Sequence, residues 1–235
     1  MATSTSFKPI THVIFDLDGL LLDTETIYFK AITEVTARYG KVYTPEIKAK
    51  TMGKTGKDAS QTVIDALDLP LTPEEATKLL EPIYSELFQN INFMPGALRL
   101  LDHLKKHSIP MAIATSSSEF SFNVKIVKHK EVFETDKYFH HIVKAAVDPD
   151  IKHGKPHPDT FLVCARRFNP PADPSLVLVF EDSTNGVKGA IAAGMQCVQV
   201  PDPMILPWND AEPTLSIPSL NDFKPELFGL PPFED

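Results

Sequence analysis

Residues 13–20 read Val-Ile-Phe-Asp-Leu-Asp-Gly-Leu, and this stretch decides the fold class. The apolar run 13–15 is typical of a buried strand. Asp16 and Asp18 follow it, and because side chains alternate along an extended chain, both carboxylates leave the backbone on the same side. Gly19 lets the chain turn sharply away from the sheet. Such a pair can bind a divalent cation and keep one oxygen free to attack, although a polar strand end entering a loop has the same residues.

Short apolar runs alternate with helical patterns along the rest of the chain. Strands are expected at 12–15, 111–115, 176–180 and 196–200, with a weaker one at 214–217. Apolar residues at helical spacing lie between them: Ala97, Leu100, Leu101 and Leu104, and then Val187, Ala190 and Ile191. This alternation predicts an α/β core of Rossmann type, with a parallel sheet covered by helices on both faces. Ligands then bind at the carboxyl ends of the strands.

Residues 22–93 carry helical periodicity and no convincing strand. The sequence therefore predicts two domains, an α/β core of residues 1–21 and 94–235 and an inserted helical cap of residues 22–93. An insertion after the first strand lies above Asp16 and Asp18, where a lid would lie. A subdomain that only packs against the core would have the same periodicity.

Three helices of the insertion can be located. Tyr28, Ala31, Ile32 and Val35 mark the first, and Val63, Ile64 and Leu67 mark the second. The third begins with Thr72 as N-cap and Pro73 at the first helical position. Pro82 should kink this helix or split it.

Composition limits the class of protein. The chain has 235 residues, of which 43% are hydrophobic, and a formal net charge of −8. The negative charge argues against a nucleic-acid partner, and no apolar run approaches the ~20 residues of a membrane span. The first nine residues do not resemble a secretory signal. We therefore expect a cytoplasmic monomer, with Cys164 and Cys197 as small buried hydrophobic residues.

Three later segments carry polar groups suited to phosphate chemistry. Thr115-Ser116-Ser117-Ser118 follows the second expected strand and can grip phosphate oxygens or form a simple N-cap. Lys155 lies between Gly154 and Pro156, which positions it for a phosphate or an aspartate, although a loop lysine is commonly solvated. Glu181 and Asp182 end an apolar strand, where two buried acids favour a bound cation.

Asp16-Leu17-Asp18-Gly19, Thr115, Lys155-Pro156 and Glu181-Asp182, in this order, resemble the four motifs of haloacid dehalogenase-type phosphatases. The resemblance spans nearly the whole chain, and the helical insertion is similar to the cap of the β-phosphoglucomutase-like subgroup. Within that subgroup, residues 15–25, 52–54, 114–117 and 224–231 are similar to pseudouridine-5′-phosphatases.

The resemblance implies a role for each motif. Asp16 would attack phosphorus, and Asp18 would protonate the leaving oxygen and later deprotonate water. Mg²⁺ would be bound by the Asp16 carboxylate, the Asp18 backbone carbonyl and Asp182. Glu181 would contact groups around these ligands rather than the metal itself, or would reach the metal through a bound water. Thr115, the Ser116 backbone N–H and Lys155 would stabilise the oxygens of the transferring group.

The resemblance also implies a small phosphorylated metabolite as substrate, with pseudouridine 5′-phosphate ahead of glycerol or sugar phosphates. Phosphomutases of the subgroup carry a histidine on the first cap helix and an arginine in the cap turn, where this chain has Tyr28 and Gly56. Hydrolysis is therefore expected rather than phosphoryl transfer within a sugar, although Lys54 and Lys57 could substitute for the lost groups. Tyr28 and Lys54 are the expected substrate-binding residues of the cap.

Two other interpretations remain at this point. A binding protein that keeps the fold without activity has no reason to retain the charges of Asp16, Asp18, Lys155 and Asp182. The histidine pairs His103/His107 and His140/His141 lack a cysteine or acid at ligand spacing, so we expect them on the surface rather than at a zinc ion.

Overall fold

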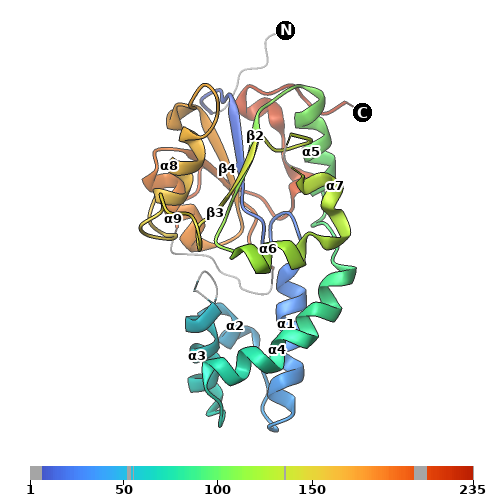
Figure 1. The fold of residues 1–235 in the computed structure, drawn as a ribbon. Coiled ribbons are helices and arrows are strands. Elements are labelled where there is room, and N and C mark those ends of the chain that lie inside the picture. The colour runs from blue at the N-terminus through green and yellow to red at the C-terminus, as the bar shows by residue number, and fades with distance from the viewer. Residues whose placement is uncertain (1–6, 52–53, 55, 135, 204–210, 235) are drawn as a thin grey trace.

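The computed structural model describes residues 7–51, 54, 56–134, 136–203 and 211–234, and within these ranges six parallel strands form one sheet (Figure 1). The order across the sheet is β3-β2-β1-β4-β5-β6. The strands are β1 (His12–Phe15), β2 (Met111–Thr115), β3 (His141–Lys144), β4 (Val177–Glu181), β5 (Gln196–Gln199) and β6 (Leu215–Ser216). The predicted parallel α/β core is confirmed. From β1 the chain adds strands first on one side of the sheet, with β2 and β3, and then on the other, with β4, β5 and β6. The sheet therefore changes direction at β1, the strand that carries Asp16 and Asp18 at its carboxyl end.

Both faces of the sheet are buried. Val13 and Phe15 contribute to one apolar cluster and Ile14 to the other, as the period-two alternation of a strand requires. Helices α8 (Asp159–Arg166) and α9 (Thr184–Ala192) cover the face of Ile14, and α5 (Ala97–Lys106) and α7 (Lys130–Phe133) lie on the other side (Figure 1). The 3₁₀ turns Leu220–Asp222 and Pro225–Phe228 complete the second layer.

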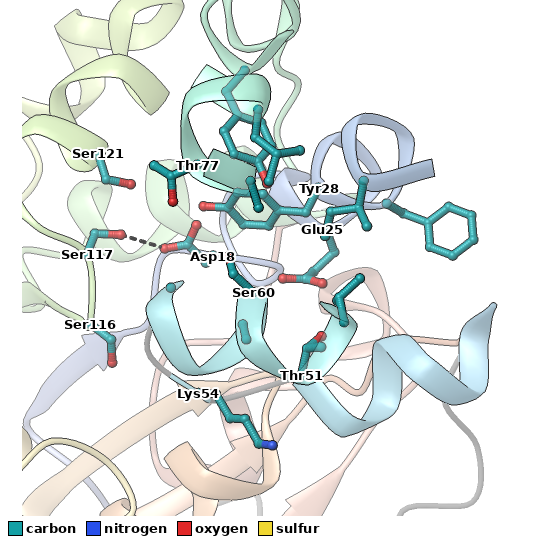
Figure 2. Close-up of a pocket in the computed structure, with 18 of the residues that line it drawn as sticks. Asp18, Glu25, Tyr28, Thr51, Lys54, Ser60, Thr77, Ser116, Ser117 and Ser121 are labelled. Atoms are coloured by element: carbon teal, nitrogen blue, oxygen red, sulfur yellow. Dashed lines mark hydrogen bonds between the residues drawn. The ribbon is translucent and has the colours of Figure 1, made fainter. Parts of the chain in front are cut away.

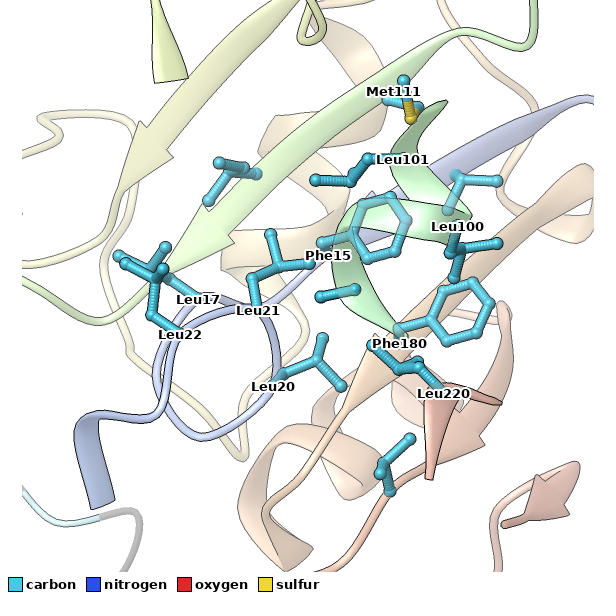
Figure 3. Close-up of a cluster of buried hydrophobic side chains, with 14 of the residues drawn as sticks. Phe15, Leu17, Leu20, Leu21, Leu22, Leu100, Leu101, Met111, Phe180 and Leu220 are labelled. Carbon is cyan, nitrogen blue, oxygen red and sulfur yellow. The ribbon is translucent and has the colours of Figure 1, made fainter. Parts of the chain in front are cut away.

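The loop after β1 is anchored by four leucines. Leu17, Leu20, Leu21 and Leu22 are all fully buried beside Phe15 and Leu100 (Figure 3). Gly19 has φ +75°, and its N–H donates to the carbonyl of Leu22 at 3.0 Å. Each fully buried leucine stabilises the fold by about 1.5–3 kcal/mol. The two aspartates therefore project from a loop whose backbone is held by the core.

In the described part of residues 22–93, four helices lie between this loop and the rest of the core. They are α1 (Thr24–Ala37), α2 (Pro45–Thr51), α3 (Gly56–Leu67) and α4 (Pro73–Leu87). The α4 start is a capping box in which Thr72 and Glu75 bond each other's backbone, as its sequence indicates. Pro82 lies inside α4, which continues through it as one helix. The helices bury apolar clusters of their own around Val63, Ile64 and Leu80.

The chain leaves and rejoins the α/β layer at adjacent points. Leu22 and Phe93 form an isolated antiparallel bridge, and the helices between them lie apart from the sheet, on the side of α6 (Glu119–Lys125) (Figure 1). We propose residues 22–93 as the cap, with residues 1–21 and 94–235 as the core.

Some local expectations need correction. Ile191, placed on the apolar stripe of α9, is 43% exposed. His103 is buried rather than on the surface, with Nε2 2.9 Å from the carbonyl oxygen of Pro231. Cys164 and Cys197 are buried free thiols, as expected. None of the helices in the described ranges has the length and hydrophobicity that crossing a membrane requires.

Candidate active site

The register of the sheet brings the predicted motifs together. Phe15 lies opposite Phe180 on one side and opposite Ile113 on the other. The next residue, Asp16, therefore lies beside Glu181 of β4 and Ala114 of β2, and its N–H donates to the carbonyl of Phe180 at 3.0 Å. Three segments that are far apart in the sequence thus end at one edge of the sheet.

Lys155 joins these strand ends. Its Nζ donates to Asp16 Oδ1 at 2.5 Å, to Glu181 Oε1 at 2.7 Å and to the Ala114 carbonyl at 2.9 Å. Its side chain is only 6% exposed, so it is held in place rather than solvated. Although burial lowers the pKa of Lys155, the charges of Asp16 and Glu181 outweigh that effect and raise it, so the ammonium stays charged.

Asp16 lies in a cluster with more carboxylates than cations. Burial raises the pKa of Asp16 to about 7, and the charges of Glu181 and Asp18 add to that effect while Lys155 opposes it. A further positive charge at this point would lower the pKa of Asp16 and keep its carboxylate ionised.

Glu181 is completely enclosed. Its Oε2 accepts hydrogen bonds from the backbone N–H groups of Asp182 and Ser183 and from the Ser183 hydroxyl, at 3.0–3.1 Å. Gly186 packs so close that a Cβ there would lie 1.8 Å from the Glu181 carboxylate carbon. Both oxygens of Glu181 therefore have protein partners, and its side chain is arranged to orient Lys155.

Asp182 lies against the turn that carries Asp18. A Cβ at Gly19 would lie 2.4 Å from Asp182 Oδ2 and 3.1 Å from Glu25 Cγ, so only glycine allows this approach. Burial raises the pKa of Asp182 well above its ordinary range, and the nearby charges of Glu181, Asp16 and Glu25 raise it further.

These oxygens fit a hard divalent cation. Excess buried negative charge and carboxylate donors are what Mg²⁺ requires, and Asp16 and Asp182 present them beside the Asp18 backbone. Within the described ranges, no three His, Cys, Asp or Glu side chains converge as a ready-made metal site. A set of two carboxylates and one carbonyl, completed by phosphate and water, agrees with that observation.

Asp18 has different partners from Asp16. Lys125 Nζ lies 2.6 Å from Asp18 Oδ1, and the Ser117 hydroxyl donates to Asp18 Oδ2 at 2.9 Å. Burial acts to raise the pKa of Asp18, but the charge and hydrogen bond of Lys125, with the bond from Ser117, lower it overall. Neighbouring carboxylates at one strand end thus have pKa values shifted in opposite directions.

The segment after β2 brings Thr115 and Ser117 toward Asp18. Thr115 is fully buried, and its Oγ1 accepts the Ser117 N–H at 3.1 Å and lies 3.5 Å from Asp18 Oδ2. Ser116 is exposed on the wall of the cavity. Ser117, rather than Ser116, is the serine that contacts an acidic residue of the site.

A cavity of about 780 Å³ opens from these acids into the helical region (Figure 2). Tyr28 lines it from α1, and its hydroxyl points toward Asp18 (Figure 2). The ring of Tyr28 is fixed by edge contacts with Tyr84 and Phe88, with centroids 5.3 and 5.8 Å apart. Burial raises the pKa of Tyr28 well above its ordinary range, so its hydroxyl keeps its proton and can donate.

The two cap lysines lie farther from the acids. Lys54 lines the cavity and donates from Nζ to Thr62 Oγ1 at 2.9 Å. Lys57 is exposed and pairs with Glu74 at 3.3 Å. Met52, Gly53 and Thr55 of the predicted cap turn lie outside the described residues.

Three residues of the site were not predicted as site residues: Lys125, Glu25 and Lys48. Lys125 follows the buried Phe122 by three residues and so lies on the inner side of α6, a signal that the sequence contains. Lys48 of α2 is 3% exposed and pairs with Asp202, which follows β5, and with Glu25 at 3.3 Å. It ties the helical region to the core.

Comparison with known proteins agrees with this geometry. Residues 13–200 match the haloacid dehalogenase-like hydrolase family. The chain is 43% identical over 228 residues to a probable pseudouridine-5′-phosphatase of Drosophila melanogaster, covering 97% of each chain. It is also 43% identical over 229 residues to (DL)-glycerol-3-phosphatase 2 of Arabidopsis thaliana, covering 96% of this chain and 94% of that one.

Among solved structures, β-phosphoglucomutase of Clostridium difficile has the same fold. The TM-score is 0.68 at 24% identity, and the match covers 92% of this chain and 93% of that one. The interpretation as a binding protein without activity is set aside, because the relatives that match along nearly the whole chain are phosphatases. The chain therefore belongs to the haloacid dehalogenase-like hydrolases and is a phosphoric monoester hydrolase.

Proposed function

We propose that the chain is a Mg²⁺-dependent phosphomonoesterase that acts through an aspartyl-phosphate intermediate, with pseudouridine 5′-phosphate as substrate. The observation that carries the proposal is the Asp16 carboxylate, held 2.5 Å from Lys155 at a strand end and facing a cavity of about 780 Å³. A buried carboxylate next to a fixed cation is a suitable nucleophile for phosphorus, which carries negative oxygens that the cation also attracts.

In the first half-reaction, an Asp16 oxygen bonds to phosphorus as the ester P–O bond breaks. Lys125 lowers the pKa of Asp18 in the free protein, whereas the negative charge of a bound phosphate ester raises it, so that Asp18 carries a proton in the complex. Asp18 gives this proton to the leaving oxygen, so the alcohol departs neutral. In the second half-reaction, Asp18 takes a proton from water as the water oxygen bonds to phosphorus and the Asp16–phosphorus bond breaks. Asp18 ends protonated and ready for the next ester, and Asp16 is regenerated as carboxylate.

The remaining groups bind and orient the phosphoryl group. We assign Lys155, Thr115 and the Ser116 N–H to its oxygens, because Lys155 contacts Asp16 at 2.5 Å and Thr115 and Ser116 lie at the end of β2, the neighbour of β1. Asp16, the Asp18 carbonyl and Asp182 would hold Mg²⁺, which supplies the positive charge that brings carboxylate and phosphate together. Glu181 orients Lys155 through the ion pair of 2.7 Å.

The size of the cavity supports a substrate larger than glycerol phosphate. The cavity extends beyond Asp18 along Phe29, Ile32 and Tyr84 of the cap, which suits a planar base and sugar better than a three-carbon polyol. We assign Tyr28 and Lys54 to the leaving group and propose that the cap covers the site as a lid. We expect the protein to act on this small phosphorylated substrate as a monomer in the cytoplasm, and to bind neither nucleic acid nor membranes.

A glycerol- or sugar-phosphate phosphatase is the second candidate. The hydroxyls of Thr51, Ser60 and Thr77 line the same cavity (Figure 2), and such groups can hydrogen-bond a polyol. A phosphomutase is disfavoured, because Tyr28 and Gly56 stand where the mutases carry histidine and arginine.

The test is phosphate release from purified protein with and without Mg²⁺, on pseudouridine 5′-phosphate, uridine 5′-phosphate, glycerol 3-phosphate and sugar phosphates. The proposal expects activity only with the metal and the highest kcat/KM on pseudouridine 5′-phosphate. A higher kcat/KM on glycerol 3-phosphate would favour the second candidate, and no release from any ester would refute the activity.

A further inference from the structure

Lys125 is a buried lysine that the chemistry above does not use. It ends α6, and its side chain is 3% exposed. Removing an ammonium group from water is costly unless partners compensate. Its Nζ has two such partners, Asp18 Oδ1 at 2.6 Å and Ser117 Oγ at 2.7 Å.

Lys125 and Ser117 together hold both oxygens of Asp18. The Ser117 hydroxyl accepts from Lys125 and donates to Asp18 Oδ2 at 2.9 Å, while Lys125 itself contacts Oδ1. The three side chains thus form a closed polar ring. Rotation of the Asp18 carboxylate about its last torsion, which is otherwise loosely restricted, would break at least one of these contacts.

The same ring contacts the cap. The Tyr28 ring lies 5.4 Å from Lys125 Nζ, and its hydroxyl points toward Asp18 (Figure 2). In the fold, α6 lies between the sheet and the cap helices (Figure 1). Asp18 is therefore held from the side on which the leaving group must sit, whereas Asp16 is held by Lys155 on the side of the sheet.

We propose that Lys125 is a positioning residue that, with Ser117, aims the Asp18 carboxyl group at the ester oxygen of the leaving group. The inference rests on the proposed function, in which Asp18 is the acid and base. Proton transfer requires Asp18 within hydrogen-bond reach of that oxygen, and a displacement of 1 Å can cost about 10² in rate. A lysine that only neutralised a buried acid would not need the serine that fixes the second oxygen.

The test compares two leaving groups in Lys125→Met. Nitrophenolate departs without a proton, whereas the alkoxides of pseudouridine 5′-phosphate and glycerol 3-phosphate need one. Because kcat/KM reports the steps up to release of the alcohol, Lys125→Met should lower it on the alkyl esters about tenfold more than on p-nitrophenyl phosphate. Asp18→Asn should show the same pattern more strongly, and Lys125→Arg should restore part of the loss.

Lys144→Met is the matched control. Lys144 also pairs with α6, through Glu119 at 2.7 Å, and its Nζ lies 4.7 Å from the centre of the Phe122 ring, whereas Lys125 contacts Asp18. Lys144→Met should leave the ratio between esters unchanged. Thermal unfolding of each variant shows whether the fold is kept, and Ser117→Ala, a smaller change, should give a weaker selective loss if Lys125→Met does not fold.

The outcomes separate the two proposals. Equal losses on alkyl and aryl esters, or no loss, in both Lys125→Met and Ser117→Ala would overturn the positioning role and leave the phosphatase proposal standing. A wild-type protein that releases no phosphate from any ester would refute the proposed function and, with it, this inference.

Discussion

The two ends of the cavity differ in how their polar groups are held. At the core end, Asp16, Lys155 and Glu181 form one buried ion-pair network whose members follow three separate chain segments. At the cap end, the polar groups are spaced along apolar helices, and Lys54 donates to Thr62, a neighbour of the same cap segment. On the proposed function, the core end contacts the phosphoryl group that all phosphate esters share, while the cap end contacts the leaving group, which differs between esters.

The largest effect should come from the core end. Asp16→Asn removes the attacking oxygen and keeps the volume, so turnover should fall by at least about 10⁴-fold with the fold retained. Steady-state phosphate release and thermal unfolding of the same preparation would check this. A folded variant with substantial activity would rule Asp16 out as the nucleophile.

Substitutions of the adjacent acids Glu181 and Asp182 should affect different properties of the protein. Asp182→Ala should raise the Mg²⁺ concentration needed for half activity by about 10–100-fold, because it removes a proposed ligand. Glu181→Gln breaks a buried ion pair with Lys155 and should lower the free energy of unfolding by about 3–5 kcal/mol. Metal titrations and urea unfolding of both variants would separate the roles, and a larger metal effect in Glu181→Gln would reverse the assignment.

The surplus of acids at the core end predicts how stability depends on pH without metal. The pKa of Asp16 is raised to about 7 in the fold, so between pH 4 and 7 the folded state binds more protons than the unfolded chain. The free energy of unfolding should therefore fall as pH rises through this window, and level off above it. Asp182 and Glu25, whose pKa values are also raised, act in the same direction.

Urea unfolding of the protein in chelator, from pH 4.5 to 8, measures this slope. Asp16→Asn lacks the titrating group and should show a shallower decline, and added Mg²⁺ should flatten the wild-type curve. Stability that increases over the same range would contradict the acid surplus.

The smallest effects should come from the cap end. Tyr28→Phe and Lys54→Met should change the ratio of kcat/KM between pseudouridine 5′-phosphate and glycerol 3-phosphate by about 3–10-fold, since each removes one donor from the leaving group. The rate on p-nitrophenyl phosphate should change less. Equal losses on all esters would mean that these residues support the cap fold rather than substrate choice.

Elements whose signals lie in neighbouring residues could be predicted from the sequence alone. The apolar run before Asp16 predicted β1 at its observed bounds, and Thr72 with Pro73 predicted the start of α4, because strand alternation and capping depend on neighbouring residues. The strand β3 was not predicted, because its four residues, His141–Lys144, lie at the edge of the sheet and show only weak alternation of apolar and polar side chains. An edge strand needs less apolar sequence than a central one.

The pairs of charged side chains that form ion pairs could be identified only from the packing of the fold. The order of motifs indicated that Asp16, Lys155 and Glu181 belong to one site, but the register of β1 against β4 brings them within 2.5–2.7 Å. Nothing in the pattern around Lys125 predicted its ion pair with Asp18. The packing of α6 buries Lys125 beside that carboxylate. The reason is physical: periodicity is a property of neighbours along the chain, whereas an ion pair between residues a hundred positions apart depends on how the layers pack.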